Sequence, residues 1–539
     1  PIAIPTGGMI ASLAAGNTLI YKPASDAIAT AYEVCKCIWR GGVSQNTLQF
    51  LPGPGSSVGE TLTTHPDVDY VILTGGTETG MRIIRKRPGV YLAAETGGKN
   101  ATIVTAMSDR DQAIKNVLHS AYSNAGQKCS ATSLLLLERE VYEDDHFRKA
   151  LVDAAASLYV GSPWLFRTKV GPLIHPPEDD LQKALTTLEP GEEWALKPRE
   201  VDGNPYIWSP GIKWGVRPGS YTHTTEFFGP VLGVMCFDTL DEAIDLVNMT
   251  GYGLTSGIES LDRREQAKWK TSIKAGNLYV NRGTTGAIVL RQPFGGMGKS
   301  ALGAGIKAGS PNYVTQLMRF EETDFPPTGP IENDYRLLRV VGDWRLKLKA
   351  GGFPEALGDD IRKTVRAVES YLYHYETEFS REKDYFKLRG QDNLFRYLPG
   401  GTVAVRGHPD DSLFDVLARM AAVRITGCTL VVSIPPSLDN GVVRFLRGED
   451  GKRFMPNLAI SWATDLDLAK SIPKVQRIRY AAPDRVPATL FDAAAETGFY
   501  IARSPVFMEG RIELIHYFQE QAVSDSYHRY GNLGERAVE

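Results

Sequence analysis

The sequence predicts an α/β fold built on parallel sheets, because strand-like and helix-like segments alternate through roughly the first hundred residues. Strands are expected over 18–21 and 68–73, with a helix over 28–39 between them. Apolar residues recur at helical spacing over 111–123, and an apolar strand over 134–137 follows after a short loop. A chain of 539 residues has room for about two to four folded units.

Composition excludes several classes of protein. With 60 basic and 63 acidic residues the formal net charge is −3, so no nucleic-acid partner and no anionic membrane surface is expected. Five scattered cysteines do not make a disulfide framework, and no apolar run is long enough for a transmembrane segment. A cytoplasmic protein is therefore expected, and the start at Pro1, without an initiator Met, predicts a piece of something longer.

Two stretches divide the chain. Residues 190–218 are rich in Pro, Gly and Trp and are predicted to be irregular, whereas 241–249 are predicted to form a helix. The run Pro-Pro-Thr-Gly-Pro at 326–330 is the clearest linker, and a second region with its own strand and helix pattern follows over 331–539.

Part of the second region is predicted to be a degenerate repeat of the first. Each matched segment keeps the pattern of apolar residues but lacks the functional residue of the first copy. A chance similarity of two parallel-sheet units stays open as the alternative. The matched segments are Gly16–Lys22 with Gly427–Ser433, Pro66–Gly76 with Pro473–Pro483, and Gly89–Glu95 with Gly498–Ser504.

Cys129 is the candidate nucleophile. It lies in Asn-Ala-Gly-Gln-Lys-Cys-Ser (124–130), between a predicted helix and strand, where small residues let a substrate approach the sulfur. A lone cysteine is more often a small buried apolar residue, and only its context reverses that reading. Cys35 and Cys37 point to different faces of a predicted helix, so no metal site is expected there.

Three further features suit a redox enzyme. Glu95 follows an apolar strand and precedes a Gly pair, which is where general bases of sheet proteins stand. Thr-Gly-Gly-Thr-Glu-Thr-Gly (74–80) joins a strand to a helix, so its N–H groups can face a pyrophosphate. Residues 51–59 form a second glycine-bearing loop, and Lys22 can reach ribose hydroxyls from the end of a strand. Alone, each is more often an ordinary turn or a surface residue.

Together these segments resemble the aldehyde dehydrogenase superfamily over roughly residues 1–325. The motifs occur in the family's order: Tyr-Lys-Pro, Thr-Gly-Gly-Thr-Glu-Thr-Gly, Glu-Thr-Gly-Gly-Lys, Gly-Gln-Lys-Cys, Glu-Phe-Phe-Gly-Pro and Pro-Phe-Gly-Gly-Met-Gly. The resemblance implies a Rossmann-like cofactor domain and an α/β catalytic domain, with Cys129 as nucleophile and Glu95 as general base. It implies that a nicotinamide dinucleotide is bound by Lys22, Ser25, Gly55, Gly75, Gly76, Gly80, Glu226 and Phe228.

Within the superfamily the chain is most similar to the glutamate semialdehyde (1-pyrroline-5-carboxylate) dehydrogenases of proline catabolism. Gln-Lys-Cys-Ser (127–130) and the segment 281–296 carry this likeness. It implies that Ser130 and the backbone of Gly286 and Ala287 clasp the substrate's α-carboxylate, while Phe294 packs on its aliphatic stem. A hydroxyl and backbone N–H groups suit a carboxylate.

The second region resembles the C-terminal domain of the long proline-utilisation flavoenzymes, itself a degenerate relative of the aldehyde dehydrogenase fold. The implied domains are a partial NAD-binding domain over 1–97, a catalytic domain with its return segment over 98–325, and a structural domain with an association tail over 331–539. The tail is expected to pack on the catalytic unit or another subunit, so a homo-oligomer is implied. The resemblance also implies a proline dehydrogenase upstream in the same polypeptide, carrying FAD and tied peripherally to the inner membrane.

Two departures from the family's pattern matter. The Asn of its Asn-Phe-Pro segment, which helps hold the oxyanion, would precede Pro1, and losing such a donor costs about a hundredfold to a thousandfold in rate. The isolated chain is therefore expected to be nearly inactive. Ser25 stands near the place where NAD-preferring members often carry an acid, so NADP stays open beside NAD. Another semialdehyde or aliphatic aldehyde dehydrogenase, a coenzyme A acylating relative and a non-catalytic scaffold are the alternative functions.

Overall fold

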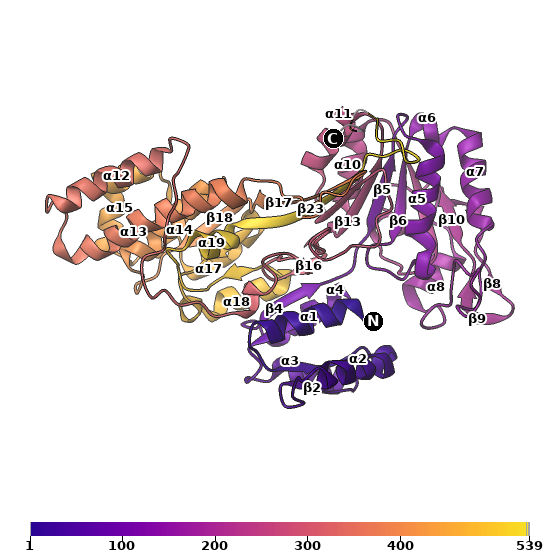
Figure 1. The fold of residues 1–539 in the computed structure, drawn as a ribbon, viewed down its shortest axis with the longest axis horizontal. Helices are drawn as coiled ribbons and strands as arrows, with labels where there is room; N and C mark the ends of the chain where they lie inside the picture. The colour runs from indigo at the N-terminus through magenta and orange to yellow at the C-terminus, as the bar shows by residue number, and fades with distance from the viewer. Residues whose placement is uncertain (1, 535, 537–539) are drawn as a thin grey trace.

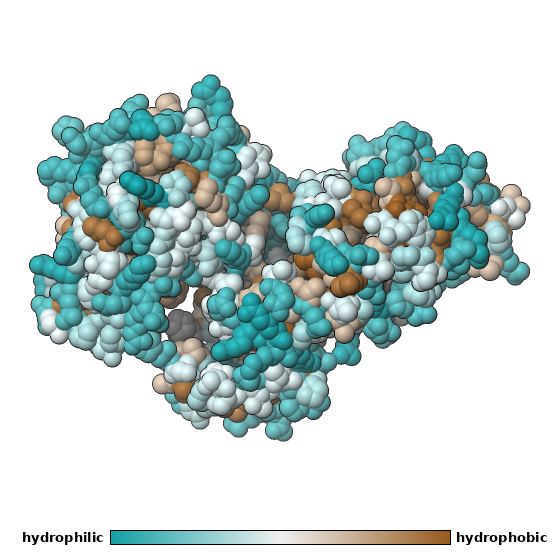
Figure 2. Space-filling model, turned by 180° about the vertical axis from the view of Figure 1, so that it is seen from behind, coloured by the Kyte–Doolittle hydropathy of each residue, from teal (hydrophilic) through white to brown (hydrophobic). Residues whose placement is uncertain are grey.

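The computed structural model describes residues 2–534 and 536. Figure 1 shows three lobes: an N-terminal lobe with α1 to α4, a second lobe with α5, β5 and β6, and a C-terminal lobe at the opposite end of the molecule from the second. The candidate nucleophile Cys129 precedes β6, so the second lobe is called the catalytic lobe below. Among the described residues no helix is both long and apolar enough to span a bilayer. Seen from behind, most of the surface is hydrophilic or neutral, and apolar side chains gather between the helices of the C-terminal lobe (Figure 2).

The N-terminal lobe alternates strands and helices, as predicted. Strands β1 and β2 pair in parallel, β3 and β4 pair in parallel, and β16 (Ala301–Leu302) adds antiparallel to β4. Gly75 follows β3 and leads into α4, so a glycine turn joins a strand end to a helix start. The elements are α1 (Ala3–Ala14), β1 (Leu19–Tyr21), α2 (Ile28–Arg40), β2 (Leu48–Phe50), α3 (Glu60–Thr64), β3 (Tyr70–Thr74), α4 (Thr77–Lys86) and β4 (Tyr91–Glu95).

A nine-stranded sheet organises the catalytic lobe, in the order β17-β23-β14-β13-β5-β6-β11-β10-β7. Its central strands are covered on both faces: in β6, Leu134 and Leu136 pack on one apolar cluster, Leu135 and Leu137 on another. The strands are β5 (Asn100–Val104), β6 (Thr132–Glu138), β7 (Glu193–Leu196), β10 (Gly211–Trp214), β11 (Val231–Phe237), β13 (Thr255–Glu259) and β14 (Asn277–Val280). The helices are α5 (Arg110–Tyr122), α6 (Arg139–Tyr142), α7 (Asp145–Ala156), α8 (Asp179–Thr186), α9 (Tyr221–Thr224), α10 (Leu240–Met249) and α11 (Arg263–Ser272).

The prediction that residues 190–218 are irregular was wrong. That stretch contains β7 and β10, both in the catalytic sheet, and the separate hairpin of β8 (Glu200–Val201) and β9 (Asn204–Trp208). Pro198 packs against Gly211, where a Cβ would lie 2.9 Å from its ring, so proline and glycine here fit a close crossing of chains. All four residues of β10 are buried, although Lys213 is among them. That lysine interrupts the apolar run.

The C-terminal lobe has its own five-stranded parallel sheet. The order β20-β19-β18-β21-β22 is the 3-2-1-4-5 order of dinucleotide-binding folds. Its strands are β18 (Thr402–Arg406), β19 (Thr429–Ile434), β20 (Ile460–Trp462), β21 (Arg477–Arg479) and β22 (Ile501–Ala502). The helices are α12 (Arg336–Lys349), α13 (Glu355–His374), α14 (Leu413–Ile425), α15 (Gly441–Arg447), α16 (Glu449–Phe454), α17 (Asp465–Lys470), α18 (Ala488–Thr497) and α19 (Gly510–Glu513).

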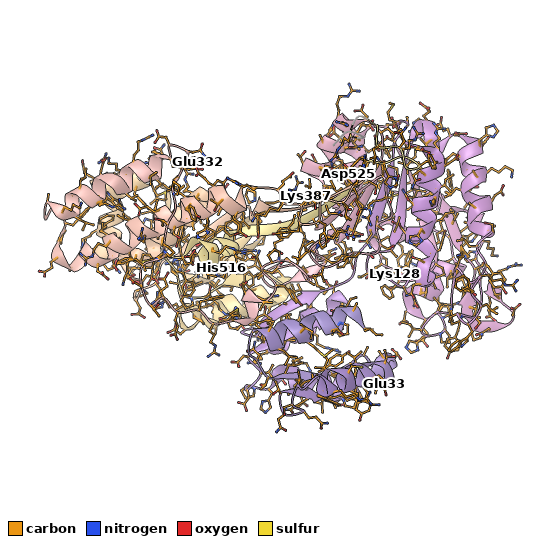
Figure 3. The ribbon with its side chains drawn as sticks, viewed as in Figure 1. Glu33, Lys128, Glu332, Lys387, His516 and Asp525 are labelled. Atoms are coloured by element: carbon orange, nitrogen blue, oxygen red, sulfur yellow. The ribbon has the colours of Figure 1, made fainter. Side chains whose placement is uncertain are left out.

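Two long strands tie the C-terminal lobe to the catalytic lobe. Strands β17 (Gln391–Pro399) and β23 (Phe518–Ser526) pair antiparallel along their whole length, and β23 also pairs in parallel with β14. In Figure 3, His516 lies in the C-terminal lobe and Asp525 lies at the catalytic lobe. The region after residue 330 is therefore not closed on itself, because two of its strands complete the catalytic sheet.

Candidate active site

The loop that carries Cys129 has a strained backbone. A short 3-10 helix (Ser123–Gly126) precedes it, in which Asn124 and Ala125 have φ of 57° and 54°. Gly126, at φ +70°, lies so near Gly229 that a Cβ would come within 2.2 Å of the carbonyl oxygen of that residue. Left-handed geometry at non-glycine residues is uncommon and concentrates at functional sites, and here it turns the chain abruptly from α5 toward β6.

Asn100, at the start of β5, holds the nucleophile's loop against the sheet. Its side-chain amide donates to the carbonyl oxygens of Cys129 (2.6 Å) and Ala131 (3.0 Å), and its Oδ1 accepts from the N–H of Thr255 (3.0 Å). Cys129 is left half-buried in this arrangement. In Figure 3 the neighbouring Lys128 lies on the side of the catalytic lobe toward the N-terminal lobe.

Glu95 ends β4 with its carboxylate in the interior. Its Oε2 accepts from the N–H of Gly296 at 3.1 Å. Burial raises the pKa of this carboxyl to about 8, although the charge of Lys307 and the Gly296 N–H both act to lower it. A carboxyl whose pKa is near neutral can both take and release a proton at physiological pH, as a general base must.

The charge of Glu95 acts on the thiol of Cys129. Burial raises the pKa of the Cys129 thiol to about 11, and the negative charges of Glu95 and Glu226 raise it further, so both carboxylates lie within electrostatic reach of the sulfur. The N–H groups of Cys129 and Ser130 act in the opposite direction. The shared site of a thiol and a carboxylate stays a prediction, with which this electrostatic effect is compatible.

Glu226 contacts the glycine pair that follows Glu95. The N–H of Gly98 donates to its Oε1 at 2.8 Å, and a Cβ at Gly97 would overlap its carboxylate, so the Gly pair after Glu95 makes room for it. Burial raises the pKa of Glu226. Phe228, at φ 54°, remains 41% exposed, and so can contact a ligand.

The turn between β3 and α4 fits a diphosphate. No atom lies within 4 Å of where a Cβ at Gly76 would be, and no side chain caps the helix it precedes. Gly80 packs against Leu302, whose Cδ1 would be 2.6 Å from a Cβ, which keeps α4 close to the sheet. The uncapped N–H groups and the positive end of the helix dipole suit an anion.

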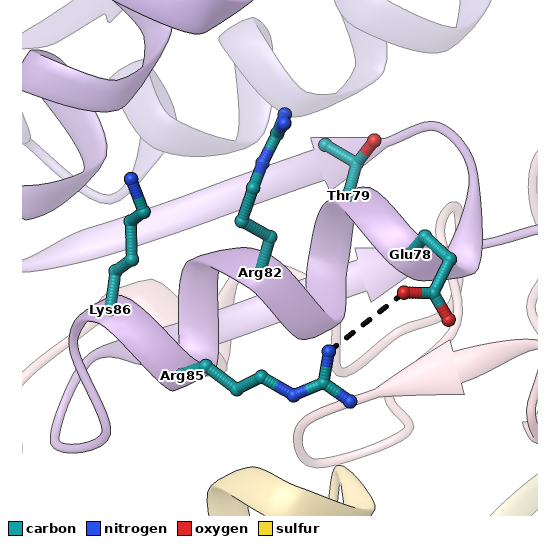
Figure 4. A pocket seen from close by; sticks show the side chains of 5 residues that line it. All are labelled: Glu78, Thr79, Arg82, Arg85 and Lys86. Atoms are coloured by element: carbon teal, nitrogen blue, oxygen red, sulfur yellow. Dashed lines mark ion pairs between the residues drawn. The ribbon is translucent and has the colours of Figure 1, made fainter.

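An open hollow of about 440 Å³ lies along α4 itself. Figure 4 shows its lining, in which Arg82 and Lys86 extend over one side of the helix while Arg85 pairs with Glu78 at 3.8 Å. Thr79 completes the wall. This cationic surface continues from the glycine turn and favours a negatively charged ligand.

The other residues assigned to the dinucleotide lie near β1 and β2. The ammonium of Lys22 donates to the carbonyl oxygen of Pro23 at 2.9 Å, and its stem passes 3.2 Å from where a Cβ at Gly59 would lie. Gly55 starts the turn that includes Gly59, and no atom lies within 4 Å of its Cβ position. Ser25 is exposed and begins a 3-10 helix.

The residues assigned to the substrate belong to two joined segments. Thr284 donates through its hydroxyl to the carbonyl oxygen of Ser130 at 2.8 Å, which fixes the loop after β14 beside the nucleophile's loop. Gly286 has φ +88° and is exposed with Ala287, so their N–H groups lie at the surface of this loop. Phe294 is half-buried and pairs with Ala308 through the backbone.

Sequence reasoning missed the groups behind Glu95. Lys307 is fully buried, and its ammonium donates to the carbonyl oxygen of Gly295 and to Asn277 Oδ1 (3.3 Å). Its backbone N–H donates to Oε2 of Glu520 at 2.7 Å. A lysine among the glycines of 303–309 was a usable signal, whereas Glu520 lies 213 residues further along the chain and no local motif marks it.

The N–H of Gly75, in the glycine turn, donates to the carbonyl oxygen of Glu95 at 3.2 Å, and the Glu95 charge acts on the Cys129 thiol. Residues 1–322 match the model of the aldehyde dehydrogenase family. The chain belongs to that family. The resemblance and the aldehyde dehydrogenase fold predicted from the sequence are confirmed.

Relatives of this aldehyde dehydrogenase carry informative names. A 1-pyrroline-5-carboxylate dehydrogenase of Geobacillus kaustophilus (strain HTA426) is 34% identical over 330 residues, 59% of this chain and 63% of the relative. The structure of Proline Utilization A (PutA) from Corynebacterium freiburgense has 37% identity and a TM-score of 0.81, covering 98% of this chain and 49% of that one. A Thermus 1-pyrroline-5-carboxylate dehydrogenase with bound NAD has 34% identity and a TM-score of 0.54, covering 59% of this chain and 62% of that one. The chain thus spans less than two thirds of each relative.

Proposed function

We propose that this chain oxidises L-glutamate γ-semialdehyde, the open form of 1-pyrroline-5-carboxylate, to L-glutamate with NAD. The observation that carries the proposal is a buried Glu95 carboxylate, held by the Gly296 N–H at 3.1 Å, whose charge acts on the sulfur of Cys129. The names of the relatives supply the substrate, and the Thermus neighbour with bound NAD supplies the cofactor.

The chain's own residues have separate tasks in this reaction. Cys129 attacks the aldehyde carbon, giving a thiohemiacetal, and after oxidation the same sulfur holds a thioester. Glu95 then takes a proton from water, whose oxygen attacks the thioester; the carbon–sulfur bond breaks and glutamate leaves. Ser130, Gly286 and Ala287 hold the α-carboxylate, and Phe294 covers the carbon stem.

A nicotinamide dinucleotide, when bound, supplies the hydride acceptor for the oxidation step. The glycine turn before α4 would hold its diphosphate, Gly55 would let the chain come close to it, and Lys22 would bind the adenosine ribose. Glu226 and Phe228 would hold the nicotinamide end. The exposed Ser25 leaves room for a 2′-phosphate, so the KM for NADP should be measured beside that for NAD.

Cys129→Ala tests the proposal in the protein that carries this chain. The variant should lose all reduction of NAD by glutamate semialdehyde, because no other group can form the thioester, while its dissociation constant for NAD stays within about threefold of the parent's. Cys37→Ala, which alters an exposed thiol, is the control. Turnover that survives in Cys129→Ala would overturn the proposal. A kcat/KM higher for succinate semialdehyde than for glutamate semialdehyde would instead support a different semialdehyde dehydrogenase.

An upstream proline dehydrogenase with FAD and assembly into a homo-oligomer are proposed on the likeness to PutA alone. Steady coupling of proline oxidation to NAD reduction in the full-length protein, without release of free 1-pyrroline-5-carboxylate, is the expected result. Size-exclusion chromatography with light scattering measures the assembly.

A further inference from the structure

One peptide group separates a buried lysine from the proposed base. The carbonyl oxygen of Gly295 accepts from the ammonium of Lys307, and the N–H of the same peptide, that of Gly296, donates to Glu95 Oε2 at 3.1 Å. Hydrogen bonds in series polarise one another, so a cation on the oxygen strengthens the bond that the N–H makes. Lys307 therefore acts on Glu95 both through space and through this peptide.

The space around the ammonium is closed. A Cβ at Gly276 would lie 2.3 Å from Lys307 Nζ and 1.9 Å from the carbonyl oxygen of Gly295, so only glycine fits there. Asn277 Oδ1 accepts from both Lys307 Nζ (3.3 Å) and the N–H of Gly295 (3.1 Å), so one oxygen holds both donors in place. A group held this tightly loses little energy to reorganisation when charge moves nearby.

Glu520 fixes the segment that presents this lysine. Its carboxylate, on β23, accepts from the N–H of Lys307 (2.7 Å), the Asn312 amide (2.6 Å) and the Ser310 hydroxyl (3.3 Å). Glu520 is 5% exposed. The second half of the chain thus reaches the proposed base through three hydrogen bonds on one carboxylate.

The charged and polar groups around this cluster come from several elements. Lys307 and Glu520 both shift the pKa of Glu95. The charge of Glu95 in turn raises the pKa of Cys129 and of Tyr313, and burial is the main cause that raises the pKa of Tyr313 to about 12. Behind Glu520, Asn312 also donates to the Tyr397 hydroxyl at 2.8 Å and accepts from Arg511 at 2.6 Å, and Arg511 pairs with Glu378. Lys307 is the cation nearest to Glu95 in this set, since its charge is the one that lowers the pKa of that carboxyl.

We propose that Lys307, fixed by Glu520, is a positioning residue that polarises the Gly295–Gly296 peptide and thereby makes Glu95 an effective base for thioester hydrolysis. The inference rests on the proposed role of Glu95. According to this inference, the region after residue 330 influences thioester hydrolysis through one carboxylate, that of Glu520 on β23, which holds Lys307 in place. Without the lysine charge, the buried carboxyl should hold its proton more tightly and activate water only at higher pH.

The test isolates hydrolysis of the acyl-enzyme. p-Nitrophenyl acetate acylates a thiol without any cofactor, so the burst of nitrophenolate reports acylation of Cys129 and the later steady rate reports deacylation. In Lys307→Met the midpoint of the deacylation pH profile should move up by about one unit, with deacylation about tenfold slower at pH 7 and the burst unchanged. Lys307→Gln, which keeps a donor but no charge, should show the same shift and serves if the Met variant does not fold.

Glu520→Ala removes a negative charge that itself raises the pKa of Glu95, so the upward movement of the midpoint expected in this variant can come only from the loosened Lys307. The double variant with Lys307→Met should shift no further than Lys307→Met alone. Lys268→Met and Glu382→Ala remove exposed charges as matched controls, and neither should move the midpoint. Folded Lys307 variants with the parent's midpoint would overturn this inference. A parent protein without any burst, or without any NAD reduction, would instead overturn the proposed function.

Discussion

At the scale of single residues, the site holds its thiol in the protonated form. Burial and two carboxylates raise the pKa of Cys129 to about 11, whereas a free cysteine titrates near 8.5. The raised value protects the sulfur from unspecific oxidation when no ligand is bound, because the thiolate is the reactive form. Activation must therefore come with ligand binding.

Alkylation kinetics can measure this directly. The rate of Cys129 labelling by iodoacetamide should rise about tenfold per pH unit between pH 7 and 10, because only the thiolate fraction reacts and its pKa lies above this range. In Glu95→Gln the loss of one negative charge should lower the pKa of the thiol and speed labelling at pH 8. Peptide mass spectrometry separates Cys129 from the exposed Cys37. A rate that levels off by pH 8.5 would contradict the raised pKa.

The sequence offers candidates for the reacting residues but not for the residues that support them. Cys129 and Glu95 occur in local motifs whose residue types the chemistry requires, so a single loop or strand end reveals each one. The contacts of Lys307 and Glu520 depend on how strands far apart in the chain come to lie side by side, which no local pattern encodes. Nor could spacing show that Gly296 would donate to Glu95.

At the scale of elements, the predicted helices and strands of the first half agree with the structure within a few residues, because their apolar periods are clear. The failure over 190–218 has a physical cause. Strands β7 to β10 are short and lie in antiparallel pairs, and Pro and Gly between them were taken for loop signals. At the positions matched to the glycine turn and to Glu95, the C-terminal lobe has Ala482, Pro483 and Ser504.

Strand β21 ends in a fully buried ion pair. Arg479 donates to both carboxylate oxygens of Glu513 at 2.9–3.0 Å, and neither side chain is exposed. Tyr517 also donates to Glu513, at 2.7 Å. Breaking such a pair leaves an uncompensated charge in the interior, which costs far more than a surface pair is worth.

Glu513→Ala should lower the free energy of unfolding by about 3–5 kcal/mol, because Arg479 would stay buried without its partner. Urea unfolding followed by circular dichroism provides the measurement. Asp334→Ala removes an exposed partner of Arg339 and should change the same quantity by less than about 1 kcal/mol. Equal effects of the two substitutions would show that the buried pair contributes no more than a surface one.

At the scale of the whole molecule, the two halves share one sheet. Strand β23 lies between β17 and β14, and the N–H of Ala522 donates to the carbonyl oxygen of Gly276 at 2.9 Å. Gly276 is the residue against which Lys307 packs. The junction of the lobes and the support of the proposed base are therefore the same few strands.

Ala522→Pro should uncouple the lobes. Proline removes the donor to Gly276 in a strand paired on both sides, which costs about 3 kcal/mol or more. Thermal unfolding should change from one cooperative transition to two, and deacylation should slow as in Lys307→Met. Glu321→Pro, in the irregular segment before α12, is the control and should leave one transition. A single unshifted transition in Ala522→Pro would refute the coupling.

The separation of β14 and β23 along the chain also bears on how the protein is made. Residues 518–526 are synthesised more than two hundred residues after β14, so the catalytic sheet keeps an open edge until β23 inserts. Closing it requires contacts across more than two hundred residues, which slows folding. Newly made chains should therefore depend on chaperones until β23 inserts, and enzyme activity should appear only after residues 518–526 have been translated and have paired with β14.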